Sequence, residues 1–230
     1  MAFLEVSEGK RVYFEHYPGP RATVVLVHGW GMQCRVWDGL LVPLQAAGYG
    51  VISFDQRGCG QSDKDFAEVS IATSADDAIR IMDHLGVQRA VFNGWSIGGA
   101  VSVAAAHRLG ARCQGLISTV GATPRFTQAA DFPFGAPAGA VAGMVEQLRA
   151  DRASFLHGLN QNVFALPVSE AVKTWTWQMF MQTSPCADLA LLDLGEIDQR
   201  ALLRGLEVPL LAIVGARDQV VAPDIVRQAA

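Results

Sequence analysis

The chain has 230 residues, 50% of them hydrophobic, and a formal net charge of −4. This is enough for a core of ordinary size in one or two domains, and the charge, without a long basic run, argues against nucleic acid and membrane surfaces as partners. The N-terminus has acidic residues and no signal-like apolar stretch, which predicts a cytoplasmic protein. The cysteines lie far apart and form no CxxC pair, so neither a zinc knuckle nor a redox motif is indicated.

The first 121 residues alternate strand-like and helix-like segments. Residues 2–6 and 11–16 fit an opening antiparallel hairpin. Apolar, β-branched runs typical of buried strands follow at 23–27, 51–54, 90–92 and 116–120. Apolar residues at helical spacing predict helices at 36–47 and 74–85. This alternation predicts an α/β fold with a doubly wound, mostly parallel sheet and helices on both of its faces.

The motif His28-Gly29-Trp30-Gly31 comes directly after the first buried strand. Its glycines allow a sharp bend at the end of the sheet, which leaves the backbone N–H of Trp30 available to a ligand. After the next strand, Asp55 and Arg57 are interpreted as residues that brace a turn by hydrogen bonds.

The segment Gly94-Trp95-Ser96-Ile97-Gly98 joins the strand at 90–92 to a helix rich in small residues. This is the GxSxG pattern of a nucleophile elbow, in which two glycines relieve crowding in a tight turn and the serine oxygen is exposed. The N–H of Ile97 then lies at the positive end of a helix. The amides of Trp30 and Ile97 are therefore expected to converge as an oxyanion hole beside Ser96.

The alternation stops at residue 121, and a helical insertion is predicted at 122–200, so that residues 1–121 and 201–230 form the core. Helix-like segments lie at 140–148, 152–159, 168–181 and 189–197. Such an insertion is expected to lie over the carboxyl ends of the strands, where open α/β sheets bind ligands. Its aromatic residues, with Trp95, are the candidate pocket residues. They are Trp95, Phe132, Phe134, Phe155, Trp175 and Trp177, with Phe164 and Phe180 as further aromatic side chains of the insertion.

A last buried strand is expected at 209–214, followed by Gly215-Ala216-Arg217-Asp218. An acid just beyond the carboxyl end of a strand lies at the same sheet edge as Ser96 and is able to orient an imidazole. Asp218 is therefore the candidate triad acid.

These signatures, in this order, resemble the α/β-hydrolase superfamily over nearly the whole chain. HGWG, GWSIGG and Gly215-x-x-Asp218-x-x-Val221-x-Pro223 look most like pimeloyl-carrier-protein methyl ester carboxylesterases, with haloperoxidase, arylesterase and enol-lactonase members also similar. The resemblance implies a serine hydrolase that cleaves a carboxylic ester or lactone through Ser96, a histidine and Asp218. It also implies a small-molecule substrate and no cofactor, and it leaves the oligomeric state open.

The histidine of that pattern should follow Asp218, but no histidine does. Each of the five histidines has a structural explanation, so the interpretation is a C-terminally incomplete core whose triad histidine lies beyond residue 230. As given, the chain is expected to be nearly inactive. One alternative is a non-catalytic or slow receptor for a small ester-like ligand, similar to the hydrolase-derived plant hormone receptors. Another is perhydrolase, haloperoxidase-like or enol-lactonase activity.

Overall fold

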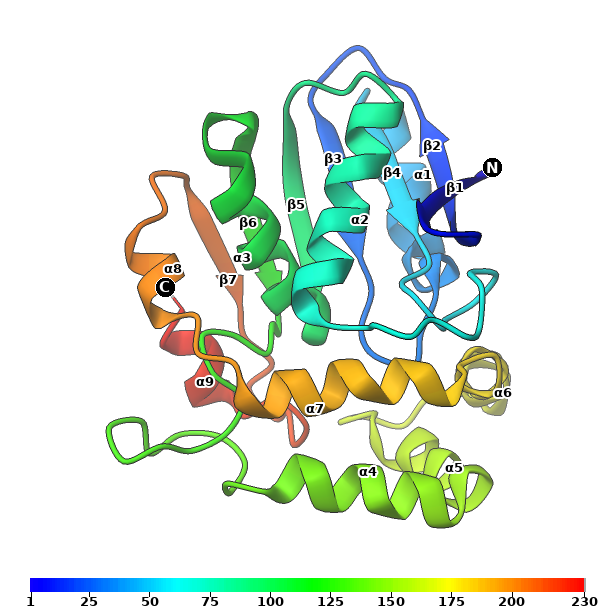
Figure 1. Cartoon of the computed structure of the whole chain (residues 1–230), viewed down its shortest axis with the longest axis vertical. Coiled ribbons are helices and arrows are strands. Elements are labelled where there is room, and N and C mark those ends of the chain that lie inside the picture. The colour runs from blue at the N-terminus through cyan, green and yellow to red at the C-terminus, as the bar shows by residue number, and fades with distance from the viewer. Residues whose placement is uncertain (230) are drawn as a thin grey trace.

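The computed structural model describes residues 1–229 and contains one seven-stranded sheet in the order β1-β2-β4-β3-β5-β6-β7 (Figure 1). The strands are β1 (Ala2–Ser7), β2 (Lys10–Tyr17), β3 (Thr23–Val27), β4 (Gly50–Phe54), β5 (Ala90–Trp95), β6 (Cys113–Thr119) and β7 (Leu210–Ile213). β1 and β2 form the expected hairpin, and β2 is antiparallel to β4. The remaining pairs are parallel, which confirms the predicted fold class.

Helices cover both faces of the sheet because successive strand residues point to opposite sides. On one face, Val25 and Val27 of β3 pack in the main core with α2 (Ile71–His84) and α3 (Ile97–Leu109). On the other face, Val24 and Leu26 pack against η1 (Cys34–Trp37) and α1 (Asp38–Ala46). β3 is therefore buried on both faces, as its continuous apolar sequence predicts.

The segment between β6 and β7 forms a group of helices beyond the carboxyl ends of the parallel strands (Figure 1). They are α4 (Ala140–Ala150), α5 (Arg152–Asn162), α6 (Glu170–Met181), η3 (Pro185–Ala187), α7 (Asp188–Glu196) and α8 (Arg200–Arg204). α7 runs along the strand ends, with α4 packed against it (Figure 1). We call α4 to α7 the lid helices. Together with Met32 of the loop after β3, they form a second, smaller core that includes Val145, Leu148 and Leu156.

β7 differs from its expected description as a strand buried on both faces. Leu211 and Ile213 are 57% and 46% exposed, because β7 is the edge strand and no segment within residues 1–229 covers one of its faces. After β7 and the loop that carries Asp218, the chain continues into α9 (Pro223–Arg227). Residue 230 lies outside the described residues. No helix within 1–229 combines the length and apolar character needed to cross a membrane.

Candidate active site

Ser96 stands at the turn between β5 and α3 with φ +55° and ψ −123°, a backbone conformation that residues other than glycine rarely adopt. Its carbonyl oxygen accepts hydrogen bonds from the amides of Gly99 (2.9 Å) and Ala122 (2.8 Å). The flanking glycines are sterically required: a Cβ at Gly94 would lie 2.1 Å from the carbonyl oxygen of Gly98. A Cβ at Gly98 would lie 2.2 Å from that of Val27. The turn at Ser96 is therefore sharp, and neither flanking glycine leaves room for a side chain.

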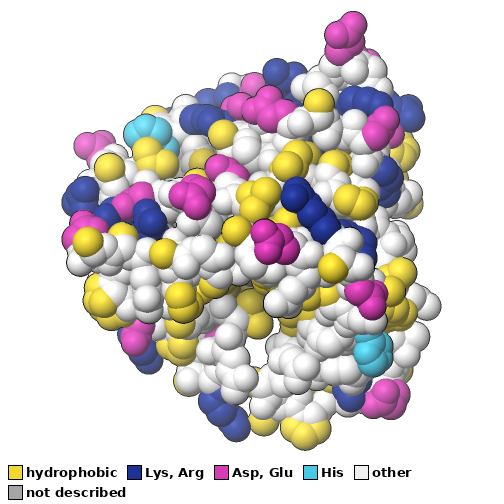
Figure 2. All heavy atoms as spheres, turned by 60° about the horizontal axis from the view of Figure 1, so that its bottom comes forward, with side chains coloured by type: hydrophobic (Ala, Val, Ile, Leu, Met, Phe, Trp, Pro, Cys, Tyr) yellow, Lys and Arg dark blue, Asp and Glu magenta, His cyan; other side chains and the backbone are white. Residues whose placement is uncertain are grey.

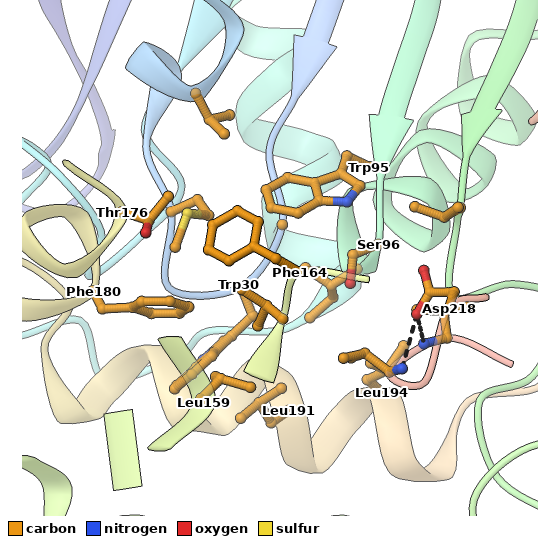
Figure 3. Close-up of a pocket in the computed structure, with 18 of the residues that line it drawn as sticks. Trp30, Trp95, Ser96, Leu159, Phe164, Thr176, Phe180, Leu191, Leu194 and Asp218 are labelled. Carbon is orange, nitrogen blue, oxygen red and sulfur yellow. Dashed lines mark hydrogen bonds between the residues drawn. The ribbon is translucent and has the colours of Figure 1, made fainter. Parts of the chain in front are cut away.

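Ser96 lines a cavity of about 400 Å³ between the strand ends and the lid helices (Figure 3). On the lid side of the molecule, the space-filling view shows a hollow with hydrophobic side chains around it (Figure 2). Ser96 and Asp218 lie at one end of the cavity, and Thr176 and Phe180 lie at the other (Figure 3). Most of the other lining side chains are apolar. They include Met32, Val36, Phe126, Met144, Leu159, Phe164, Leu191 and Leu194.

Asp218 belongs to the loop after β7 and lines the same cavity as Ser96. Its Oδ1 accepts hydrogen bonds from the amides of Val220 (2.8 Å) and Val221 (2.9 Å), which fix the orientation of the carboxylate (Figure 3). Within residues 1–229, Oδ2 has no hydrogen-bond partner. This oxygen is therefore available to accept a hydrogen bond from a donor in the cavity, as the acid of a triad accepts one from an imidazole N–H.

Trp30 and Ile97 also line the cavity, and the backbone N–H of neither donates a hydrogen bond to another of the described residues. His28 holds the Trp30 loop in place. Its Nε2 accepts from the amide of Gln56 (3.0 Å), and its Nδ1 donates to the carbonyl of Gly29 (2.7 Å). Burial lowers the pKa of His28, which keeps the imidazole neutral in this pattern of bonds. His28 is thus a structural residue with both nitrogens already used.

The turn after β4 confirms the interpretation of Asp55 and Arg57 as bracing residues. The Asp55 carboxylate accepts from the amides of Cys34 (2.6 Å) and Gln61 (2.7 Å). Arg57 makes a two-pronged ion pair with Asp77 of α2, at 2.7 and 2.9 Å, and both side chains are buried. These bonds fix the loop that lies beside the Trp30 loop.

A family model described as alpha/beta hydrolase fold matches residues 22–230. The chain belongs to the α/β-hydrolase family. It is 30% identical to a pimeloyl-[acyl-carrier protein] methyl ester esterase of Klebsiella pneumoniae, over 88% of this chain and 78% of that protein. It is 28% identical to a non-heme haloperoxidase of Rhodococcus erythropolis, over 96% of this chain and 83% of that protein.

Among solved structures, an esterase from Exiguobacterium antarcticum superposes with a TM-score of 0.93 and 26% identity. The match covers 99% of this chain and 85% of that one. The predicted superfamily and its two neighbouring groups, carrier-protein methyl ester esterases and haloperoxidases, are therefore confirmed as relatives. The relatives and solved structures found include esterases and other hydrolases of this superfamily, which places this chain among the hydrolases.

Two of the six candidate pocket residues, Trp95 and Trp175, line the cavity of this α/β-hydrolase chain, together with Phe164 and Phe180. The other four are not among the residues that line this cavity. Phe132 is 3% exposed and packs edge-on against Phe134, whose ring joins the main core. Phe155 and Trp177 pack within the small core of the lid helices instead. All four rings hold the insertion together.

The sequence analysis missed most of the aliphatic wall. Leu159, Leu191 and Leu194 are leucines on amphipathic helices, and their spacing indicates only that they are buried. Which buried helix face borders a cavity depends on how the lid helices cross, and one sequence carries no signal for that. Thr176 was missed as well.

No histidine lines the cavity in the described part of this α/β-hydrolase chain. His157, on α5, is exposed and lies edge-on to Trp177, with 5.7 Å between ring centroids. His84 packs against Phe14 near the far end of α2. Residues 1–229 contain no group of three or more His, Cys, Asp or Glu side chains that could hold a metal ion.

Proposed function

We propose that this protein is a serine hydrolase that cleaves uncharged carboxylic esters or lactones through an acyl-enzyme on Ser96. The observation that carries the proposal is the placement of Ser96. Ser96 stands in a turn with positive φ at the start of a helix, and it lines an apolar cavity together with Asp218, Trp30 and Ile97, whose backbone N–H groups have no partner among residues 1–229. Acyl transfer by a triad needs a nucleophile, an imidazole base, an acid that orients the base, and donors for the developing oxyanion; Ser96, Asp218 and the two N–H groups would supply all of these except the imidazole.

The wall of the cavity favours an uncharged, apolar substrate. Among residues 1–229, Asp218 is the one ionisable side chain that lines it. The hydroxyl of Thr176 donates to Asn160 or to helix carbonyls of α6, so mainly its methyl group is left to contact a ligand. A charged acyl group would lose its hydration without finding a counter-ion, which is costly. The volume of about 400 Å³ is in the range of small-molecule sites.

In the proposed reaction, Oγ of Ser96 attacks the carbonyl carbon while its proton passes to an imidazole oriented by Asp218. The amides of Trp30 and Ile97 donate to the oxyanion of the tetrahedral intermediate. The bond to the alkoxide breaks, the alkoxide takes the proton from the imidazole, and water then releases the acid. Since no histidine of this sequence lies in the cavity, the mechanism requires an imidazole from outside residues 1–230. We propose that this histidine follows Asp218 in the natural protein.

The test is an esterase assay of the natural gene product with p-nitrophenyl acetate and butyrate, beside its Ser96→Ala variant. Turnover should disappear in the variant, and a butyrate analogue with a terminal carboxylate should be a poor substrate. Equal rates in parent and variant would remove Ser96 from the mechanism. Faster turnover of the carboxylate ester would refute the preference for uncharged groups.

None of the residues within 1–229 that line the cavity is a histidine, which supports a second candidate, a binding protein that retains small ester-like ligands without rapid turnover. This function predicts thermal stabilisation by a non-hydrolysable ester analogue in both parent and Ser96→Ala protein, with no Ser96-dependent release of product. Turnover that depends on Ser96 in the natural gene product would exclude it.

Perhydrolase activity is a variant of the first proposal, in which hydrogen peroxide replaces water in the second step. The similarity to the haloperoxidase of R. erythropolis supports testing it. Peracid formation from acetate and peroxide, measured beside ester cleavage, separates the two activities.

A further inference from the structure

The loop that carries the Trp30 amide is bound to the lid on its outer side. The indole Nε1 of Trp30 donates to the carbonyl of Ala187 (3.0 Å). The hydroxyl of Thr183 donates to the carbonyl of Gly31 (3.0 Å). A Cβ on Gly31 would lie 2.7 Å from the ring of Phe180, so lid and loop are in direct contact. We call residues 183–187 the lid strap.

Arg152, at the start of α5, joins this strap to the Trp30 side chain. Its Nη2 donates to the carbonyls of Thr183 (3.1 Å) and Ser184 (3.3 Å). Its guanidinium carbon lies 5.9 Å from the centre of the Trp30 ring, within the range of a cation–π contact. One guanidinium thus contacts both the strap and the indole that the strap holds.

Asp188, the first residue of α7, is the ionic partner of Arg152. Its Oδ2 accepts from Nη1 of Arg152 at 2.7 Å, and the residue is 2% exposed. Its other carboxylate oxygen is buried and has no hydrogen-bond partner among residues 1–229. Burial raises the pKa of Asp188, and the charge of Arg152 opposes that rise. The charged form of the Asp188 carboxylate is therefore stabilised mainly by its ion pair with Arg152. The same ion pair fixes the position of the guanidinium against the lid strap.

We propose that Arg152 and Asp188 are positioning residues that act through the lid strap to hold the backbone N–H of Trp30 toward the Ser96 oxygen. The inference rests on the proposed function for its effect on rate. Its structural part, that the pair orders residues 29–31, stands independently. Neither side chain lines the cavity, so their effect is indirect.

The physical reason is that an oxyanion donor works by being fixed before charge develops. The amide of Trp30 lies in a loop rather than in a helix or strand, so other contacts must restrict its movement. Removal of a whole oxyanion donor typically lowers turnover about 10²- to 10³-fold. A donor that is present but loosely held should lose part of that factor, in kcat more than in KM.

The primary test is amide hydrogen exchange of the full chain, which requires no activity. In Arg152→Gln, exchange of the peptide covering residues 28–33 should rise about tenfold, whereas peptides of β5 should be unchanged. Trp30→Phe, which removes the indole donor and keeps an aromatic ring, should raise exchange of the same peptide. Arg112→Gln is the matched control: it breaks an exposed ion pair with Asp83 (2.6 Å) on α2, away from the lid.

The kinetic test uses the natural gene product. Arg152→Gln should lower kcat about tenfold or more and change KM by less than about twofold, and Arg152→Lys should recover part of the loss. Combining Arg152→Gln with Trp30→Phe should cost less than the product of the two single effects, because both loosen one loop.

Unchanged exchange at 28–33 in both Arg152→Gln and Trp30→Phe would overturn the proposal. So would an Arg152→Gln variant with increased exchange and full kcat, because the pair would then only stabilise the lid. A parent protein without Ser96-dependent turnover would refute the proposed function, and the exchange result would still decide whether the pair orders the loop.

Discussion

The positive φ of Ser96 should lower the free energy of unfolding of this protein, and replacing the serine with glycine should raise it. A non-glycine residue in such a region typically costs ~1–3 kcal/mol, and glycine does not bear that cost. Glycine loses more conformational freedom on folding, which typically costs ~0.5–1 kcal/mol. The difference predicts that Ser96→Gly is more stable than Ser96→Ala by about 1 kcal/mol, or roughly 2–4 °C in Tm for a chain of this size.

The comparison with Ser96→Ala is essential, since both variants lose the hydroxyl and only the alanine keeps the Cβ. The assay is urea denaturation followed by tryptophan fluorescence, with Tm measured in parallel. Ser154, an exposed helical serine of α5, is the matched control position. There the order should reverse, with Ser154→Gly less stable than Ser154→Ala by about 0.5–1 kcal/mol.

A Ser96→Gly variant no more stable than Ser96→Ala, with the expected order at Ser154, would refute the strain argument. The test is independent of turnover. It therefore separates the conformation of the elbow from its chemistry.

Three further predictions concern the framework around the site. Asp77→Asn should destabilise the fold by about 3–5 kcal/mol in urea denaturation, because it leaves the buried guanidinium of Arg57 without its carboxylate. Gly98→Ala should cost at least about 1–3 kcal/mol and reduce labelling of Ser96 by a fluorophosphonate, because its Cβ would overlap the carbonyl of β3. The hydrogen bond that Tyr17 donates to Glu15 (2.6 Å), together with burial, raises the pKa of the phenol to about 12 from its ordinary value of 10.0. Since the folded state holds this proton more tightly, the stabilisation is complete below pH 10.0 and is lost as the pH rises through about 12. A Tyr17→Phe variant should show a smaller loss of stability over that range, and an unchanged profile would contradict the assignment.

Much of the sheet is predictable from the sequence because strands buried on both faces have continuous apolar runs. The runs at 23–27 and 51–54 became β3 and β4, and the hairpin at the N-terminus was confirmed. β7 has a similar run but is half exposed, since hydropathy alone does not distinguish an edge strand from a central one.

In the candidate site, too, the sequence predicts the features that local residues determine but not those that depend on tertiary packing. Ser96 lies on a turn whose glycines are sterically required, so a short local motif predicts its geometry. The pocket wall comes from helices far apart in the sequence, and aromatic content was a poor guide to it. Phe132 and Phe155 are as aromatic as Phe164, yet only Phe164 faces the cavity. The contacts of Arg152 with the lid strap and the Trp30 ring have no sequence signature, because they depend on tertiary packing.

The hydrogen bonds between the strap and the sheet loops limit how freely this insertion could be exchanged for that of a relative. A chimaera that takes another protein's residues 122–200 to broaden its ligand range would also lose the acceptor for the Trp30 indole. It would lose, too, the amide of Ser184 that donates to Gly58 (2.8 Å). A chimaera with crossover points at the ends of the insertion would thus change the rate of the reaction as well as the choice of ligand. Crossover points that keep residues 183–188 with the parent sheet should yield more functional hybrids.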